Sequence, residues 1–248
     1  MASRHHDRPH KALNGPLYAA GRWLHRQTGL LFPPCCSLCG AAGVGDWDIC
    51  AECLADLPRL GACCQRCALP LAVPGLCGAC MQRSPLFDRC ICPLLYQGPV
   101  PGLITGLKFH NRLAHARLLA ELMWQRLEQE VEWPELILPV PLHPLRLRQR
   151  GYNQALEIAR PLARRLGRPL SIRHCRRQRA TSAQSELPKR QRQKNLRGAF
   201  VLDRPLGVGH LALLDDVVTT GSTVNELARL LKGAGVQRVD VWALARTP

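Results

Sequence analysis

Aromatic residues are scarce in this 248-residue chain, at 5% of the sequence, so few side chains are available for a base-stacking platform. No apolar run approaches the ~20 residues that a transmembrane helix needs. The basic N-terminus, residues 1–32, is interrupted by polar residues every few positions and lacks the continuous apolar core of a secretory signal. We therefore expect no membrane span and a cytoplasmic location.

Acidic residues are also few, with 18 Asp and Glu against 34 Lys and Arg, which gives a net charge of +16 and a pI near 9.9. This excess predicts a polyanionic partner, nucleic acid above all. The alternative is an arginine-rich composition inherited from a high-GC genome. Apolar residues make up 46% of the chain, which suffices for a globular core.

Cysteine is almost absent after residue 92. Of the 13 cysteines, twelve lie between Cys35 and Cys92, and only Cys175 follows. Four CxxC pairs form an internal repeat of two sets, with ten residues between the pairs in the first set and nine in the second. In the reducing compartment that we expect, such pairs indicate metal ligands. The predicted ligands are Cys36, Cys39, Cys50 and Cys53 for one site and Cys64, Cys67, Cys77 and Cys80 for the other.

Four thiolates suit one tetrahedral Zn²⁺ per set, and four protein ligands leave no open position for catalysis. We therefore expect two structural zinc ions, each supplying on the order of 10 kcal/mol of folding energy. An iron–sulfur cluster and redox-active pairs are the alternatives. Whether the ligands pair sequentially or crossed stays open. Cys35 and Cys63 each precede a pair and are candidate alternate ligands, whereas we expect Cys90 and Cys92 to be bystanders, with another metal contact left open.

The composition changes near residue 93, which predicts three parts. These are an N-terminal tail at 1–32 with a short helix at 16–31, a cysteine module at 33–92, and an α/β domain at 93–248. In the last part, predicted helices at 113–127, 154–166 and 224–231 alternate with predicted strands at 136–140, 170–174, 199–202, 211–214 and 236–244. This alternation predicts a mostly parallel sheet flanked by helices, with ligand loops at the carboxyl ends of the strands.

The segment LALLDDVVTTGSTV, residues 211–224, is the most informative in the chain. A buried strand leads into a small turn rich in hydroxyl groups and glycine, and a helix follows. The turn amides and the helix N-terminus direct positive character at a phosphate. The carboxylates of Asp215 and Asp216 repel phosphate, so they are expected to face sugar hydroxyls or a divalent cation. The predicted ligand is a phosphorylated sugar.

This arrangement resembles the type I phosphoribosyltransferases, which bind phosphoribosyl pyrophosphate (PRPP). The resemblance implies that Asp215 and Asp216 face the ribose hydroxyls. It also implies a 5′-phosphate site formed by Thr219, Thr220, Gly221, Ser222 and Thr223. A Rossmann-like strand, turn and helix with solvated acids at the strand end is the alternative.

Two basic segments precede this motif. Arg146, Arg148 and Arg150 lie in a predicted loop after strand 136–140, just before Gly151, and predict an anion site. A solvated basic turn is the alternative. Residues 173–197 hold nine Lys and Arg against one acid. We expect a mobile loop there that closes over a polyphosphate or binds DNA phosphates.

Four motifs together resemble the ComF/GntX family from about residue 33 onward. They are PVPLHPLRLRQRGYNQ at 139–154, R-x-T-x-x-Q at 179–184, R-x-x-N at 192–195 followed by GAF, and LKF at 107–109. Members are competence or DNA-utilisation proteins with an N-terminal zinc module and a phosphoribosyltransferase-like domain. Ser222 departs from the usual Ala or Gly of the PRPP motif, and Pro188 makes the loop between the second and third motifs irregular.

The resemblance implies Mg²⁺-dependent PRPP binding and a role with incoming single-stranded DNA, beside a DNA-uptake helicase or channel protein. It implies catalytic positions at Asp215, Asp216, Arg146 and Arg150, and further ligand contacts from Lys108, Arg148, Arg179 and Arg192. The alternative is an active phosphoribosyltransferase of nucleotide metabolism with an unknown acceptor. A PRPP-sensing repressor is weaker, because no helix-turn-helix is evident.

Overall fold

The computed structural model describes residues 33–130, 132–179 and 196–248. By their contacts, these residues form two compact units that divide after Ala51. The predicted helix at 16–31 lies outside the described residues. Within the described part of the chain, none of the helices is both long and apolar enough to cross a membrane.

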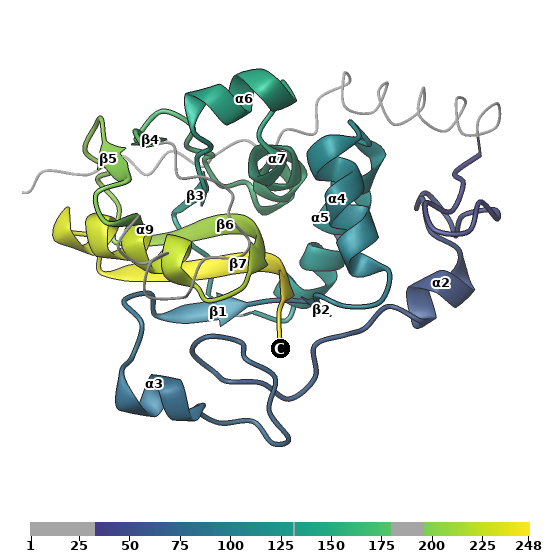
Figure 1. Cartoon of the computed structure of the whole chain (residues 1–248), viewed down its shortest axis with the longest axis horizontal. Helices are drawn as coiled ribbons and strands as arrows, with labels where there is room; N and C mark the ends of the chain where they lie inside the picture. The colour runs from purple at the N-terminus through teal and green to yellow at the C-terminus, as the bar shows by residue number, and fades with distance from the viewer. Residues whose placement is uncertain (1–32, 131, 180–195) are drawn as a thin grey trace, which may run out of the picture. The chain divides into compact units, whose positions relative to one another are not determined.

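A parallel five-stranded sheet forms the centre of the larger unit (Figure 1). Its strand order is β1-β7-β6-β3, with β2 beside β7, and every strand pair is parallel. The sheet confirms the predicted fold class. Its strands are β1 (Arg89–Ile91), β2 (Leu94–Leu95), β3 (Leu136–Pro139), β6 (His210–Val218) and β7 (Arg238–Arg246).

Helices cover the two faces of this sheet. α5 (Ala114–Leu127) and α7 (Gln154–Leu166) pack against each other, and α9 (Ser222–Gly233) packs on β7. Leu211 and Leu213 share a core cluster with Leu227 of α9, whereas the alternate residues Ala212 and Leu214 point to the opposite face. Because both faces are covered, β6 and β7 are apolar along most of their length.

Two shorter helices and a hairpin also belong to the described part of this unit. α4 (Val100–Phe109) precedes α5, and α6 (Pro144–Arg150) follows β3. β4 (Cys175–Arg177) and β5 (Phe200–Leu202) pair antiparallel and lie outside the main sheet.

Several predicted elements are confirmed, among them α5, α7, β3 and β5. The strand predicted at 170–174 is wrong, because only Leu170 bridges to the sheet and the next residues bend away. The strand predicted at 211–214 is too short. β6 continues to Val218, so the acidic pair lies inside the strand rather than after it.

The second cysteine set belongs to the same compact unit as the sheet. Ala68, from its turn, and Phe87, just beyond it, are buried in the core cluster that contains α9. Of the two short helices in the cysteine-rich region, α3 (Gly78–Gln82) lies in this second set, and α2 (Ala51–Ala55) falls at the boundary between the units. The division predicted at residue 93 stays a prediction.

Candidate functional site

The acidic pair lies near the carboxyl end of β6, where parallel sheets bind ligands. Successive side chains on a strand point to opposite faces, yet the carboxyl groups of Asp215 and Asp216 remain close enough to interact. Asp216 is buried, at 5% exposure, with Lys108 Nζ 2.5 Å from its Oδ2. Gln154 Nε2 donates to the same oxygen at 3.5 Å. Asp216 is therefore a paired, buried carboxylate.

Asp215 is in a different electrostatic state. Burial and the neighbouring Asp216 carboxylate raise its pKa to about 8, although the charge of Lys108 acts in the opposite direction. The protonated form of Asp215 is thus favoured near neutral pH until a cation or another donor compensates the charge. Such a carboxyl is suited to a ligand that brings hydroxyl donors or a divalent cation.

The turn after β6 has the geometry expected of an anion site. Thr219 and Thr220 are exposed, and Gly221 adopts φ = 71°, which favours glycine. α9 begins at Ser222, and the N–H groups of its first turn have no acceptor inside the helix. Thr220 Oγ1 and Ser222 Oγ are hydrogen-bonded at 2.8 Å. Hydroxyl groups and helix amides therefore converge at one turn.

The three arginines predicted in a loop lie instead on α6, which corrects that prediction. Pro144 occupies the first turn of this helix, the His143 side chain accepts a hydrogen bond from Leu145 N, and Gly151 ends the helix with φ = 84°. These start and stop signals were present in the sequence. Arg146 and Arg150 are half-buried and Arg148 is exposed.

Gln154, at the start of α7, connects α6 to the acidic pair. Arg150 Nη1 donates to Gln154 Oε1, and Gln154 Nε2 faces Asp216. The Arg150 guanidinium also lies 5.1 Å from the centre of the Phe109 ring. Tyr152 Oη donates to the carbonyl of Leu107 and so fixes the turn after α6 against α4. The structure therefore brings Lys108, Arg150 and Asp216 together.

The remaining predicted residues lie at the edge of the described part of the chain or outside it. Arg179 is exposed, and its guanidinium reaches the carbonyl of Arg197 at 3.4 Å. Arg192, and most of the predicted mobile loop, lie outside the described residues. Arg177 lies in the basic segment at 173–197 but was not predicted as a site residue. Burial lowers the pKa of Arg177, the charge of Arg146 lowers it further, and the charge of Asp215 acts in the opposite direction.

Both predicted cysteine sets form clusters, and within each set the four sulfur atoms lie within 4.8 Å of one another. Cys39 Sγ lies 3.7 Å from Cys50 Sγ, and Cys67 Sγ lies 3.6 Å from Cys77 Sγ. Tetrahedral zinc with bonds of about 2.3 Å requires sulfur separations of about 3.8 Å. The donor sets therefore fit zinc, and the ligands pair sequentially rather than crossed.

Backbone hydrogen bonds also favour the thiolate form of two of these cysteines, and the thiolate is the form that binds a metal. Burial opposes ionisation of Cys36, but hydrogen bonds from the backbone of Cys50, Cys39 and Leu38 lower its pKa to about 6. Cys64 has a matching environment, and its pKa is also lowered to about 6. In contrast, burial raises the pKa of Cys67 to about 11. A bound cation would offset the free-energy cost of ionising this buried thiol, as in structural zinc sites.

The other cysteines of the module stay outside these clusters. Cys35 Sγ is directed at the carbonyl of Pro33, at 3.6 Å. Cys90 is buried in β1 and Cys92 is buried just after it, with their sulfurs 3.7 Å apart.

Gly43 in the first knuckle is required by close packing, because a Cβ there would lie 2.1 Å from the Trp47 carbonyl oxygen.

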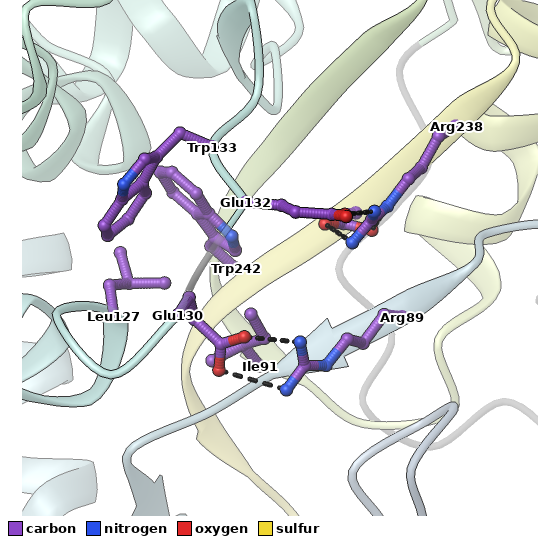
Figure 2. Close-up of a pocket in the computed structure, with 9 residues that line it drawn as sticks. Arg89, Ile91, Leu127, Glu130, Glu132, Trp133, Arg238 and Trp242 are labelled. Atoms are coloured by element: carbon purple, nitrogen blue, oxygen red, sulfur yellow. Dashed lines mark hydrogen bonds and ion pairs between the residues drawn. The ribbon is translucent and has the colours of Figure 1, made fainter.

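A cavity of about 190 Å³ lies at the opposite end of the sheet, near the amino ends of β1 and β7 (Figure 2). Arg89 pairs there with Glu130, and Arg238 pairs with Glu132 and Asp240. Trp133 and Trp242 form its apolar wall. Its charged side chains are engaged with one another, so the β6–α9 turn, and not this cavity, is the candidate functional site.

Comparisons with known proteins agree with these features. Residues 28–81 match the family model of the double zinc ribbon domain. The DNA utilization protein YhgH of Salmonella typhimurium is 38% identical over 225 residues, covering 88% of this chain and 99% of that protein. The competence protein F of Haemophilus influenzae is 36% identical over 178 residues, covering 68% of this chain and 78% of that protein.

Two solved structures also match, at low similarity. An allosteric regulatory enzyme of purine biosynthesis aligns with a TM-score of 0.34 and 17% identity, over 52% of this chain and 25% of that one. A purine phosphoribosyltransferase from Pyrococcus horikoshii aligns with a TM-score of 0.29 and 17% identity, over 56% of this chain and 73% of that one.

Proposed function

The chain belongs to the ComF/GntX family of competence and DNA-utilisation proteins, and from this we propose that it binds PRPP with Mg²⁺ and handles incoming single-stranded DNA in the cytoplasm. The observation that carries the proposal is the acidic pair of β6 followed directly by the hydroxyl turn and the N-terminus of α9. A helicase or channel of DNA uptake is the partner that fits this role.

Each part of PRPP has a matching group in this site. The amides and hydroxyls of residues 219–223 hold the 5′-phosphate. The carboxylates of Asp215 and Asp216 accept hydrogen bonds from the ribose hydroxyls. Lys108, which pairs with Asp216, and Arg150, which donates to Gln154 beside Asp216, supply positive charge for the pyrophosphate. Bound Mg²⁺ would neutralise charge on the pyrophosphate, and carboxylate oxygens are suitable ligands for it.

The direct test is calorimetric titration of zinc-replete protein with PRPP in the presence and absence of MgCl₂. We expect saturable binding that requires Mg²⁺ and that ribose 5-phosphate or pyrophosphate alone reproduces only weakly. No heat with PRPP under any magnesium condition would refute the sugar-phosphate assignment. Release of pyrophosphate with a base or oligonucleotide as acceptor would favour the second candidate, an active transferase.

Binding to single-stranded DNA should depend steeply on salt, because counterions are released from the phosphates. Replacing both Arg146 and Arg148 with Ala should flatten the plot of log K against log salt by about 0.7 for each DNA phosphate that the variant no longer neutralises. Fluorescence anisotropy with a labelled oligonucleotide at several salt concentrations measures this slope.

The matched control removes the same charge elsewhere. Arg164 is in the last turn of α7 and Arg168 follows the helix; both are exposed. Arg164 lies about 15 Å along the helix from Gln154, at 1.5 Å per residue. The Arg164→Ala, Arg168→Ala variant should keep the wild-type slope. If both double variants flatten the slope equally, DNA is held by general charge and not by α6.

A further inference from the structure

The last residue of β7, Arg246, is buried at 7% exposure and donates several hydrogen bonds to backbone carbonyls. Its Nη1 lies 3.1 Å from the carbonyl oxygen of Val218 and 2.6 Å from that of Thr219. The same nitrogen lies 2.6 Å from the carbonyl oxygen of Thr247. Val218 and Thr219 are the residues where β6 enters the candidate phosphate turn, so Arg246 holds the start of that turn.

The Nε atom of the same guanidinium contacts the second cysteine knuckle, residues 64–80. Arg246 Nε donates to the carbonyl of Cys67 at 3.0 Å. Cys67 is also one of the four clustered thiols of this knuckle. The next residue, Ala68, has φ = 56° and is fully packed in the core, which fixes the direction of this backbone. A single residue thus offers its sulfur to the metal and its carbonyl to Arg246.

Two more contacts join the chain after the knuckle to the first turn of α9. Leu86 N donates to Asn225 Oδ1 at 2.7 Å. The ring of Phe87 lies against Gly221, 3.7 Å from the place where a Cβ would stand. The second knuckle and the segment that follows it therefore support the turn at both its strand end and its helix end.

The direction of the carbonyls matters for anion binding. In a planar trans peptide the C=O and the N–H point in opposite directions. Because the carbonyls of Val218 and Thr219 face Arg246, the N–H groups of Thr219 and Thr220 point away from it. If these peptides turned over, carbonyl oxygens would face the anion instead and repel it. The fork of the guanidinium can hold several acceptors in fixed positions, which a lysine ammonium cannot.

We propose that Arg246 is a positioning residue that orients the phosphate-binding turn, and that the second zinc knuckle sets the position of Arg246 through the carbonyl of Cys67. This rests on the proposed function in one respect, that the turn binds the phosphate of PRPP. The mechanical part, the support of residues 218–224 by the knuckle, stands without any ligand.

Hydrogen–deuterium exchange of the ligand-free protein tests the mechanical part. In Arg246→Ala, backbone exchange of residues 218–224 should accelerate about tenfold or more, while zinc content stays at the wild-type value. Arg246→Lys should show a smaller acceleration in the same residues, and it decides the question if the alanine variant does not fold. Cys77→Ser, which removes a ligand of the second knuckle, should accelerate exchange in the same segment.

The matched control is Arg238→Ala, at the first residue of the same strand. Arg238 pairs with Glu132 and Asp240 at the far end of the sheet (Figure 2). This variant should leave exchange in residues 218–224 unchanged. Unchanged exchange in both Arg246 variants, or equal acceleration in Arg238→Ala, would overturn the proposal.

Titration with PRPP and Mg²⁺ then tests the link to binding. Arg246→Lys should weaken the affinity about tenfold, and Arg238→Ala should keep it. If the wild type does not bind PRPP, the proposed function fails while the exchange result still decides the support of the turn. If the turn loosens in Arg246→Lys and PRPP affinity stays at the wild-type value, Arg246 does not position the binding groups and the proposal is wrong.

Discussion

Replacement of Asp215 and Asp216 together by asparagine is expected to weaken PRPP binding by at least about 100-fold and to leave the affinity for single-stranded DNA unchanged. Asparagine keeps the shape of both side chains but removes the charge that holds a divalent cation and strengthens hydrogen bonds from ribose hydroxyls. DNA phosphates, in contrast, are attracted by Lys and Arg and gain nothing from the two carboxylates. Calorimetry with PRPP and anisotropy with an oligonucleotide measure the two affinities.

A control for this variant must convert the same number of acidic side chains to amides elsewhere in the chain. Asp203 pairs with Arg176, and Glu157 pairs with Arg160, both at partly exposed positions. The Asp203→Asn, Glu157→Gln variant should therefore bind PRPP as the wild type does. Loss of PRPP and DNA affinity to the same degree in the Asp215, Asp216 variant would contradict separate determinants for the two ligands.

The two single variants should differ, because the two carboxyls differ in environment. Asp216→Asn removes the partner of Lys108, 2.5 Å away, and so changes the charge balance of the site. Asp215→Asn replaces a carboxyl whose pKa is already raised by burial and by the neighbouring Asp216. In the absence of ligand, Asp215→Asn is therefore expected to be the milder change for stability.

The sequence predicts best those elements whose determinants are local. α7 was predicted from apolar periodicity with a stop at Gly167, and it has the predicted bounds, Gln154–Leu166. Its N-cap is Asn153, whose side chain accepts from Ala155 N at 2.9 Å, and Gly167 adopts φ = 63°. The N-cap residue, the apolar periodicity and the glycine that ends the helix all lie within fifteen residues of the sequence.

Elements that depend on distant partners were predicted poorly. β6 was expected to end at Leu214, because Asp215 and Asp216 interrupt the apolar run. The strand continues because Lys108, about a hundred residues earlier, pairs with Asp216, and because β7 pairs with β6 as far as Val218. Arg246 carried no local signal at all, since its acceptors Cys67 and Val218 are 179 and 28 residues away.

The metal clusters were predictable because CxxC spacing is itself a local signal. The same spacing did not reveal that the second knuckle packs with the sheet. That placement depends on Ala68 and Phe87, whose burial against the α9 side of the core is a tertiary property. The first strand of the sheet, β1, starts at Arg89, a few residues before the composition change near residue 93.

Loss of the second zinc is expected to have the largest effect on stability. A structural zinc site contributes on the order of 10 kcal/mol, comparable with the 5–15 kcal/mol total stability of a typical domain. Because Ala68 and Phe87 lie in the core that α9 shares, unfolding of this knuckle removes support from the sheet itself. Elemental analysis should give about two zinc ions per chain for the wild type and about one for Cys77→Ser, with a large fall in thermal stability.

Cys175→Ser is the matched control, because it replaces a buried cysteine outside both clusters. Cys175 is the first residue of β4 in the hairpin β4–β5, and burial raises its pKa to about 12, so it is a neutral thiol and not a metal ligand. This variant should keep two zinc ions and lose only the modest stability of a buried polar substitution. Two zinc ions retained in Cys77→Ser, or iron in place of zinc in the wild type, would contradict the assignment of two structural zinc sites.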